Sequence, residues 1–205
     1  MSALAEGPDG RQRCWWGVSA DDYVAYHDRE WGRPVTDDRG IYERLTLEAF
    51  QSGLSWLTIL RKRDNFRTAF DGFDFNRVAD YSAGDFERLM ADAGIVRNRA
   101  KIEAAIANAR AARDLVAAGE SLAALAWSHR PAAERPLTGL DDLVSITPES
   151  KALAKELKRR GFRFVGPTTA YALMQAVGIV NDHIEGCAVR DEVEGERQAA
   201  AAALG

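Results

Sequence analysis

The sequence predicts an all-α protein, and three observations support this prediction. Apolar residues recur at the three- and four-residue spacing of amphipathic helices along most of the chain. Residues that favour helix starts and helix ends lie at the boundaries of these segments. No convincing run of residues alternates between apolar and polar side chains, as the residues of a half-exposed strand would.

The length of the chain suits one ordinary domain. Of its 205 residues, 46% are hydrophobic, which is enough for a single core. We expect this domain over residues 12–188, with flexible tails at residues 1–11 and 189–205. The end of the second tail, RQAAAAALG, is rich in alanine and predicts a frayed helix or disorder.

Capping residues predict the first helices. Asp37 or Asp38 is expected to begin a helix that runs through Leu45, because an Asp side chain can accept a hydrogen bond from a free backbone N–H group. Ser55 is expected to begin the next helix, which continues towards Phe70. Both segments carry their apolar residues on one face.

A helix, a tight hairpin and a second helix are predicted over residues 85–117. Ser82 precedes the first of these helices, and Gly94 is expected to close it. The second helix is indicated by apolar residues at helical spacing from Ile102 to Val116.

Two further helices are predicted in the C-terminal half. Thr147 is expected at the N-cap and Pro148 at the first helical position, with Gly161 as the stop. Pro167 is expected to open the next helix, which Gly178 ends.

Charge and hydropathy limit the possible locations and partners. No stretch of about 18 uncharged apolar residues is present, and the first residues lack the apolar core of a signal peptide, so we expect no membrane contact and a cytoplasmic location. The formal net charge is -4, although residues 97–163 carry 13 basic and 8 acidic side chains. Such basic clusters are either solvated helix faces or phosphate contacts.

Aromatic residues gather near the N-terminus. Within the first 56 residues lie Trp15, Trp16, Tyr23, Tyr26, Trp31, Tyr42 and Trp56. They fit either an aromatic core or a slot of flat rings for a planar ligand. Glu48 precedes Gly53 and Trp56 by a few residues, so its carboxyl group could lie in such a slot with a perturbed pKa. An acid among aromatic rings suits a cationic aromatic ligand.

Several ordered motifs are similar to those of one enzyme family. CWWGVSADDYVAYHDREWGRP, LEAFQSGLSW and RGFRFVGPTTAYALMQAVGIVNDH, followed by the terminal histidine and cysteine, resemble the 3-methyladenine DNA glycosylase I family over residues 14–187. The resemblance implies a helix-hairpin-helix DNA glycosylase fold in which one structural zinc ion joins the N- and C-terminal segments. The implied zinc ligands are Cys14, His27, His183 and Cys187. From the residues alone, these four could equally be buried packing residues.

The resemblance also implies an activity. Members of the family flip N3-methylated adenine out of duplex DNA and hydrolyse its N-glycosidic bond, which leaves an abasic site without a lyase step. Glu48 matches the carboxylate of the base pocket as the catalytic residue, either through recognition and electrostatics or by activating water. The implied base-binding residues are Trp16, Tyr23, Tyr26, Trp31 and Trp56.

The implied partner is double-stranded DNA that contains alkylated bases, bound by a monomer. Leu54 matches the family position that fills the space left by the flipped base, although it could also be a core leucine. The hairpin is expected to bind the DNA backbone through Gly94, Arg97, Arg99 and Lys101. A non-enzymatic alternative stays open, because a zinc-stabilised module that only binds alkylated or abasic DNA would need the same features.

Overall fold

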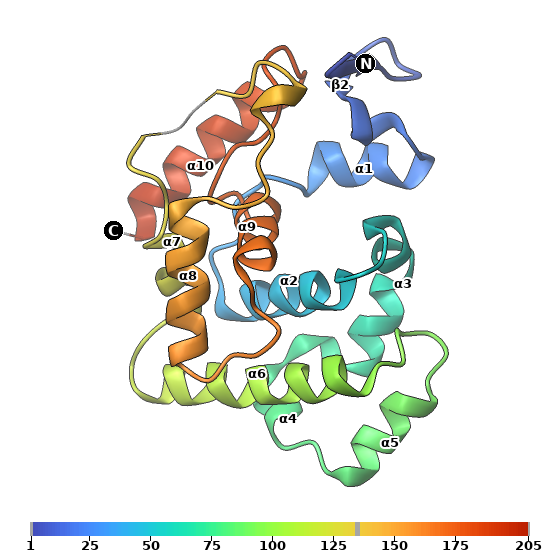
Figure 1. The fold of residues 1–205 in the computed structure, drawn as a ribbon, viewed down its shortest axis with the longest axis vertical. Helices are drawn as coiled ribbons and strands as arrows, with labels where there is room; N and C mark the ends of the chain where they lie inside the picture. The colour runs from blue at the N-terminus through green and yellow to red at the C-terminus, as the bar shows by residue number, and fades with distance from the viewer. Residues whose placement is uncertain (1, 134–135, 205) are drawn as a thin grey trace.

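The computed structural model describes residues 2–133 and 136–204 and is mainly helical, as predicted (Figure 1). The α-helices are α1 Asp21–Arg29, α2 Asp38–Gln51, α3 Trp56–Ala69, α4 Phe75–Ala79, α5 Ala83–Ala91, α6 Arg99–Ala117, α7 Leu122–Trp127, α8 Pro148–Arg159, α9 Pro167–Ala176 and α10 Arg190–Leu204. Three short 3-10 turns are η1 Trp15–Val18, η2 Asp71–Phe73 and η3 Leu140–Asp142.

The predicted capping residues begin these helices. The Asp37 side chain accepts a hydrogen bond from the Gly40 N–H group at 2.8 Å and caps α2. Ser55 caps α3 in the same way, and Thr147 caps α8 directly before its proline. The helix ends are less well predicted, since α5 already ends at Ala91, before the expected stop at Gly94.

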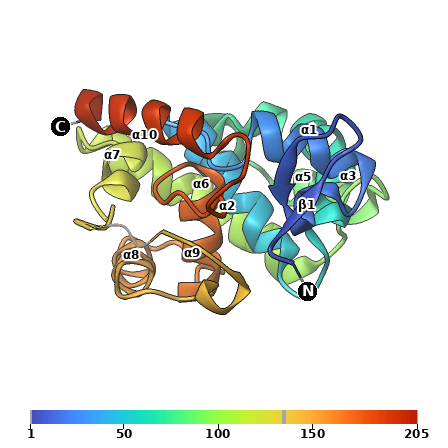
Figure 2. The same ribbon diagram turned by 90° about the horizontal axis from the view of Figure 1, so that it is seen from above.

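Helix α2 lies at the centre of the molecule. It contacts α3, α6, α7 and α9, so it is surrounded by other helices along most of its length (Figure 1). Its apolar side chains, including Leu45 and Phe50, are fully buried in the main core. Helices α8 and α9 form a hairpin on one side of the molecule, and α10 lies on the opposite side (Figure 2).

The N-terminal segment was expected to be a flexible tail, but the structure orders it. Strand β1 (Leu4–Glu6) pairs antiparallel with β2 (Gln12–Cys14). The turn between them is held by Arg13, whose buried guanidinium donates to the Asp9 carboxylate at 2.6 and 2.7 Å. Gly10, with φ near 78°, allows the chain to reverse there. The two strands are too short for an alternating pattern to reveal them.

The C-terminal segment is more ordered than predicted, because residues 190–204 form helix α10 where a flexible tail with a frayed helix or disorder at its end was expected. Val193 and Arg197 are buried on its inner face. The Arg197 guanidinium donates to the carbonyl oxygens of Gly178 at 2.6 Å and Ile179 at 2.9 Å, beyond the end of α9. Ala200, Ala201 and Leu204, in the alanine-rich end, also pack against the main core.

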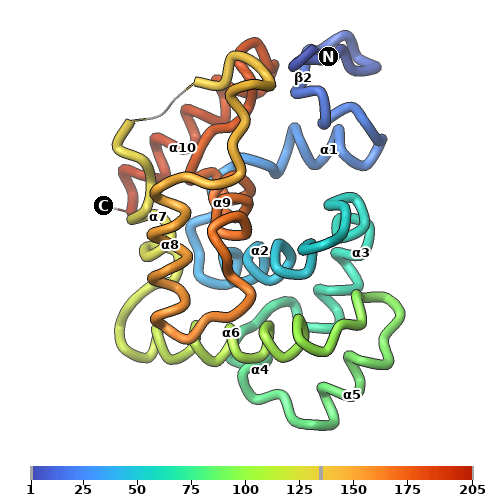
Figure 3. Tube along the Cα trace, in the orientation of Figure 1, coloured from blue at the N-terminus to red at the C-terminus, as the bar shows by residue number. Residues whose placement is uncertain are grey.

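The N- and C-terminal segments meet. The Ala188 N–H group donates to the Gln12 carbonyl oxygen at 2.9 Å, next to strand β2. Figure 3 shows the chain before α10 approaching the N-terminal strands. A second, smaller core forms at this junction from Cys14, Ile184, Cys187, Val189 and other buried residues. Among the described residues, no helix is long and apolar enough to cross a membrane.

Candidate functional site

A cavity of about 490 Å³ opens between the N-terminal segment, the end of α2, the start of α3 and helix α9. Its size lies within the range of small-molecule sites. All six residues predicted for the base pocket line this cavity, namely Trp16, Tyr23, Tyr26, Trp31, Glu48 and Trp56. The structure therefore favours the slot over the aromatic core, because these rings face open space as well as each other.

Trp16 holds the aromatic wall together. Its ring meets Tyr23 edge-on at 5.6 Å and Trp31 edge-on at 4.9 Å between centroids. Trp16 also lies 6.3 Å from the ring of Tyr26, whose centroid is in turn 5.4 Å from that of Trp56. Aromatic contacts of this kind fix ring orientation, so the slot is formed before any ligand arrives.

Glu48 is buried, with 6% of its surface exposed. Burial raises the pKa of Glu48 from 4.5 to about 8, and the positive charge of Arg44 offsets only part of this rise. Within the described residues, no hydrogen bond or ion pair reaches its carboxyl group. Arg44 and Arg63 are instead bound to the Glu30 carboxylate, at 3.2 and 2.5 Å. The carboxyl group is therefore available to a ligand, and at neutral pH a nearby positive charge favours its ionised form.

A second carboxylate lines the cavity and was missed by the sequence analysis. The Asp182 carboxylate accepts hydrogen bonds from the Tyr171 hydroxyl group and from the Gln175 side-chain amide, both at 2.7 Å. Both Gln175 and Asp182 face the cavity. The only signal in the sequence was the position of Asp182 beside the motif histidine His183, which does not show where its side chain lies.

The rim of the cavity adds apolar residues that the sequence analysis did not select. Leu143 and Val144 line the cavity although each is more than two-fifths exposed. Trp15 also belongs to this rim. Leu143 and Val144 follow η3 in a stretch without helical periodicity. Their place beside the N-terminal aromatic residues therefore depends on the tertiary fold.

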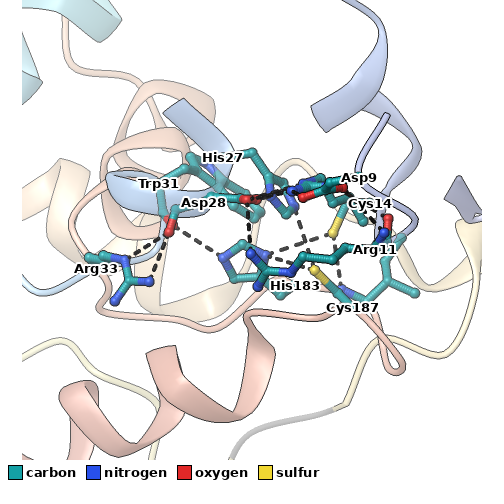
Figure 4. Close-up of polar contacts among 11 residues, drawn as sticks. Asp9, Arg11, Cys14, His27, Asp28, Trp31, Arg33, His183 and Cys187 are labelled. Atoms are coloured by element: carbon teal, nitrogen blue, oxygen red, sulfur yellow. Dashed lines mark hydrogen bonds and ion pairs between the residues drawn. The ribbon is translucent and has the colours of Figure 1, made fainter. Parts of the chain in front are cut away.

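Cys14, His27, His183 and Cys187 form one buried cluster (Figure 4). One potential ligand atom from each residue lies within 4.8 Å of all the others. The Cys187 sulfur is 3.6 Å from both His27 Nε2 and His183 Nδ1, and the Cys14 sulfur is 3.8 Å from His183 Nδ1. Neither cysteine forms a disulfide.

The chemistry and spacing of this cluster fit zinc. Two sulfur and two imidazole ligands are a common structural zinc set, and ordinary zinc–ligand bond lengths in a tetrahedron place S and N atoms roughly 3.6 Å apart. The measured separations agree with this value. The set has four ligands, so a bound ion would keep no open coordination position for a substrate.

Hydrogen bonds behind the histidine rings orient them. His27 Nδ1 lies 2.8 Å from the Asp28 carboxylate, which leaves Nε2 directed at Cys187. Asp28 in turn accepts hydrogen bonds from the Arg13 guanidinium at 2.8 to 3.1 Å. His183 Nε2 lies 3.2 Å from the Trp31 carbonyl oxygen (Figure 4). The cluster therefore contacts the backbone of a residue that also lines the cavity.

Asp28→Asn is expected to weaken zinc binding by about 10- to 100-fold, because the variant loses the carboxylate that orients His27 and increases its basicity. Competition for zinc with a chromophoric chelator measures this change, while circular dichroism checks that the protein stays folded. Asp64→Asn is the matched control, because the Asp64 side chain is 92% exposed. Equal zinc affinity in the two variants would contradict the role given to Asp28.

The predicted DNA-contact residues lie in different environments. Leu54 is 42% exposed in the turn between α2 and α3, next to Gly53 with φ near 80°. Arg97 and Arg99 are exposed, whereas Gly94 is half-buried. Arg99 packs over the ring of Phe86, with 4.7 Å between the guanidinium carbon and the ring centroid.

Lys101 is a correction to the sequence analysis. Its side chain is buried, and its ammonium group donates to the carbonyl oxygens of Phe50 at 2.9 Å and Ser52 at 2.6 Å. An ammonium group held inside the protein in this way does not contact a phosphate. Lys101 was predicted as a DNA contact together with its exposed neighbours, because the sequence of a basic cluster does not show which of its side chains is buried.

A second helical hairpin is formed by α8 and α9, which lie in contact with each other. Its loop, residues 160–166, contains Arg160 and Arg163 and the exposed Phe164. Helix α9 begins after Gly166 without a side-chain cap. Free N–H groups at a helix start suit a phosphate, so this hairpin has the features that the sequence analysis assigned to residues 85–117.

This fold is that of a known class of helical proteins. A sequence model described as methyladenine glycosylase matches residues 16–191. The chain belongs to the methyladenine glycosylase family, which confirms the resemblance found in the sequence.

Individual relatives agree with this assignment. The chain is 48% identical over 180 residues to DNA-3-methyladenine glycosylase 1 of Escherichia coli strain K12, which covers 86% of this chain and 95% of the relative. It is 42% identical to DNA-3-methyladenine glycosylase of Haemophilus influenzae over 181 residues, 85% of this chain and 96% of the relative.

Solved structures show the same fold. A crystal structure of 3-methyladenine DNA glycosylase I matches with a TM-score of 0.83 and 49% identity, over 86% of this chain and 98% of that chain. A structure of the Staphylococcus aureus 3-methyladenine DNA glycosylase I, determined to explain 3-methyladenine recognition, matches with a TM-score of 0.82 and 32% identity, over 87% and 96% of the two chains.

Proposed function

We propose that this chain is a DNA-3-methyladenine glycosylase that flips N3-methyladenine out of duplex DNA and hydrolyses its N-glycosidic bond. The observation that carries the proposal is the buried acid of Glu48 at a cavity lined by aromatic rings. The relatives that bear this enzyme name support it, since they match most of the chain.

Glu48 would select the lesion by charge. N3-methylation gives adenine in DNA a formal positive charge, whereas ordinary adenine is neutral. A cation beside Glu48 favours the ionised carboxylate, because opposite charges attract strongly where water is excluded. The aromatic rings add stacking and cation–π attraction. Normal adenine would leave the carboxyl group protonated and would gain only the stacking.

The same electrostatics would assist bond cleavage. A cationic base is already a good leaving group, so little general acid catalysis is needed, and the sugar gains positive charge in the transition state. Carboxylates at the cavity, Glu48 and Asp182, would stabilise positive charge there. This burial and lack of a bound partner support recognition and electrostatics, rather than activation of water, as the role of Glu48.

The lining of the cavity supports a monofunctional reaction. A lyase-type glycosylase needs a lysine amine as nucleophile. Among the described residues, no lysine lines the cavity, and the Lys101 ammonium is held by two carbonyl oxygens. The proposed product is therefore an abasic site in an unbroken strand.

Duplex DNA would be bound by a single chain, because one chain supplies the whole cavity and the surrounding basic residues. Leu54, exposed beside the cavity residue Trp56, would fill the space left by the flipped base. Arg97 and Arg99, together with the α8–α9 hairpin, would hold the phosphates on either side. This grip is electrostatic and would weaken as salt increases.

A structural zinc ion would be held by Cys14, His27, His183 and Cys187. With four protein ligands it would supply folding energy and no catalytic step. It would fix the segment that carries the aromatic wall, because His27 lies on α1 between Tyr26 and Trp31.

Base release tests the proposed function. The protein is expected to release 3-methyladenine from methylated duplex DNA and to leave the neutral normal bases in place, as separated by liquid chromatography. The non-enzymatic alternative predicts binding to the methylated duplex without any released base.

A further inference from the structure

We propose that Lys101 is a positioning residue whose buried ammonium group holds the turn that carries Leu54 in the shape needed to enter the duplex. The proposal deepens the proposed function and rests on it for the DNA step. It differs from a phosphate contact, because the side chain acts inside the protein and never touches DNA.

The contacts of Lys101 join two parts of the fold. Lys101 lies in the first turn of α6, and its ammonium group reaches the C-terminal end of α2. There it donates to the Phe50 carbonyl oxygen at 2.9 Å and to the Ser52 carbonyl oxygen at 2.6 Å. A helix leaves its last carbonyl groups without partners, and a cation at this end is favoured by the helix dipole.

The remaining carbonyl groups of this turn bind backbone N–H groups. The Ser52 N–H group donates to the Ala49 carbonyl oxygen at 3.4 Å, and the Leu54 N–H group donates to the Gln51 carbonyl oxygen at 2.6 Å. Lys101 therefore supplies the donors for the two carbonyl groups between and after these. Without it, the two backbone hydrogen bonds of the turn remain, and the Phe50 and Ser52 carbonyl groups lose the donor that the described residues supply.

The turn needs this support because glycine makes it mobile. Gly53 has φ near 80°, a conformation that glycine adopts easily, and an added Cβ would meet nothing within 4 Å. Leu54 follows in an exposed position. Packing therefore does little to fix this part of the turn, and the hydrogen bonds of Lys101 add to the two backbone hydrogen bonds that hold it.

Burying the Lys101 ammonium group costs desolvation free energy, and packing alone would not require a charged group at this position. Desolvation lowers the pKa of Lys101, and no carboxylate forms an ion pair with it in the part of the chain that is described. A methionine of similar length could fill the same space without a charge. The benefit of the lysine lies in its donors, which only the turn uses.

The two hydrogen bonds from Lys101 to Phe50 and Ser52, here called the Lys101 clamp, also connect two predicted DNA-contact elements. Arg97 and Arg99, which are exposed, lie within four residues of Lys101 at the start of α6. A phosphate bound by these arginines would therefore be held in a fixed relation to the inserted Leu54. Insertion would then require no further ordering of the turn, and less entropy would be lost on binding.

Lys101→Met tests the clamp in the protein without DNA. Amide hydrogen exchange at residues 52–55 is expected to become about 10-fold faster, as expected from loss of hydrogen bonds to a charged donor. Lys62→Met is the matched control, because Lys62 donates to the Ala93 and Gly94 carbonyl oxygens and leaves this turn untouched. Unchanged exchange in Lys101→Met would overturn the proposal.

A double-mutant cycle tests the link to insertion. Lys101→Met is expected to lower the preference for a duplex with an abasic-site analogue over an undamaged duplex by about 10-fold. In a Leu54→Ala background it is expected to have almost no further effect, because its influence passes through Leu54. Equal effects in both backgrounds, or faster exchange with an unchanged preference, would overturn the proposal.

Two further measurements distinguish a failure of the Lys101 proposal from a failure to fold and from a failure of the proposed enzyme activity. Lys101→Arg, which keeps the charge and the donors, is expected to restore part of the preference and stands in if Lys101→Met does not fold. Base release by the unaltered protein is measured in parallel. Release together with an additive cycle would refute the clamp alone, whereas absence of release would refute the proposed enzyme and leave the exchange result standing.

Discussion

Glu48→Gln is expected to lower the rate of 3-methyladenine release by at least about 100-fold, an effect comparable with the removal of one charge-stabilising group from an active site. The glutamine has nearly the same shape but cannot become negative beside a cationic base. Single-turnover release from methylated duplex DNA measures the change, with zinc content and circular dichroism as checks on the fold.

Glu43→Gln is the matched control for this variant. Glu43 lies on the same helix, and its carboxylate is occupied by Arg67 at 2.8 Å. It does not line the cavity. Its variant is expected to release the base at the unaltered rate. Full activity in Glu48→Gln would show that the buried acid is not used in the reaction.

Glu48→Gln is also expected to change how the free energy of unfolding depends on pH. The folded-state pKa of Glu48 is raised to about 8 from 4.5, so the folded protein binds the extra proton between these pH values and its free energy of unfolding falls as pH rises through them. Relative to the unaltered protein, Glu48→Gln is expected to be similar at pH 5 and more stable at pH 8.5 by roughly 4 kcal/mol. Urea unfolding at the two pH values measures this difference.

His183→Ala is expected to abolish high-affinity zinc binding and to disorder the N-terminal aromatic segment. The apparent binding energy of a structural zinc site, about 10 kcal/mol or more, is comparable with the whole stability of an ordinary domain. His183 contacts both sulfurs of the cluster and the Trp31 backbone, so its loss affects the cavity wall directly. Tryptophan fluorescence and thermal unfolding report the loss.

His129→Ala provides the control for the metal prediction. This third histidine lies outside the cluster, and its ring nitrogen Nδ1 lies near the Leu125 carbonyl oxygen and the Ser128 hydroxyl group. Its variant is expected to keep one zinc per chain and an unaltered fluorescence spectrum. A His183→Ala protein that lacks zinc and retains both its melting temperature and base release would contradict the structural role of the cluster.

The helices were predictable because their signals are local. Asp37, Ser55 and Thr147 cap the helices that the sequence assigned to them, since each side chain binds an N–H group only a few residues away. Strand β1 and the full extent of helix α10 were missed because they depend on distant partners. Arg197 binds carbonyl groups beyond α9, and Arg13 binds Asp28 on α1.

The candidate site shows the same contrast between residues with a distinctive sequence signal and residues whose position depends on distant contacts. Glu48 and the four cysteine and histidine residues were found because their chemical types are distinctive and their motifs resemble a known family. Asp182 was missed because nothing in its neighbourhood shows that it faces the cavity. Lys101 was misassigned because its sequence neighbours are exposed, while its own direction is set by contact with α2.

The most direct test of the central claim is the product balance at stoichiometric protein on methylated duplex DNA. The account predicts that each released 3-methyladenine is matched by one abasic site, that the strand stays unbroken until alkali is added, and that Glu48→Gln releases almost none. Tight binding of the duplex by folded, zinc-loaded protein, with no base released, would contradict the account and favour the binding module.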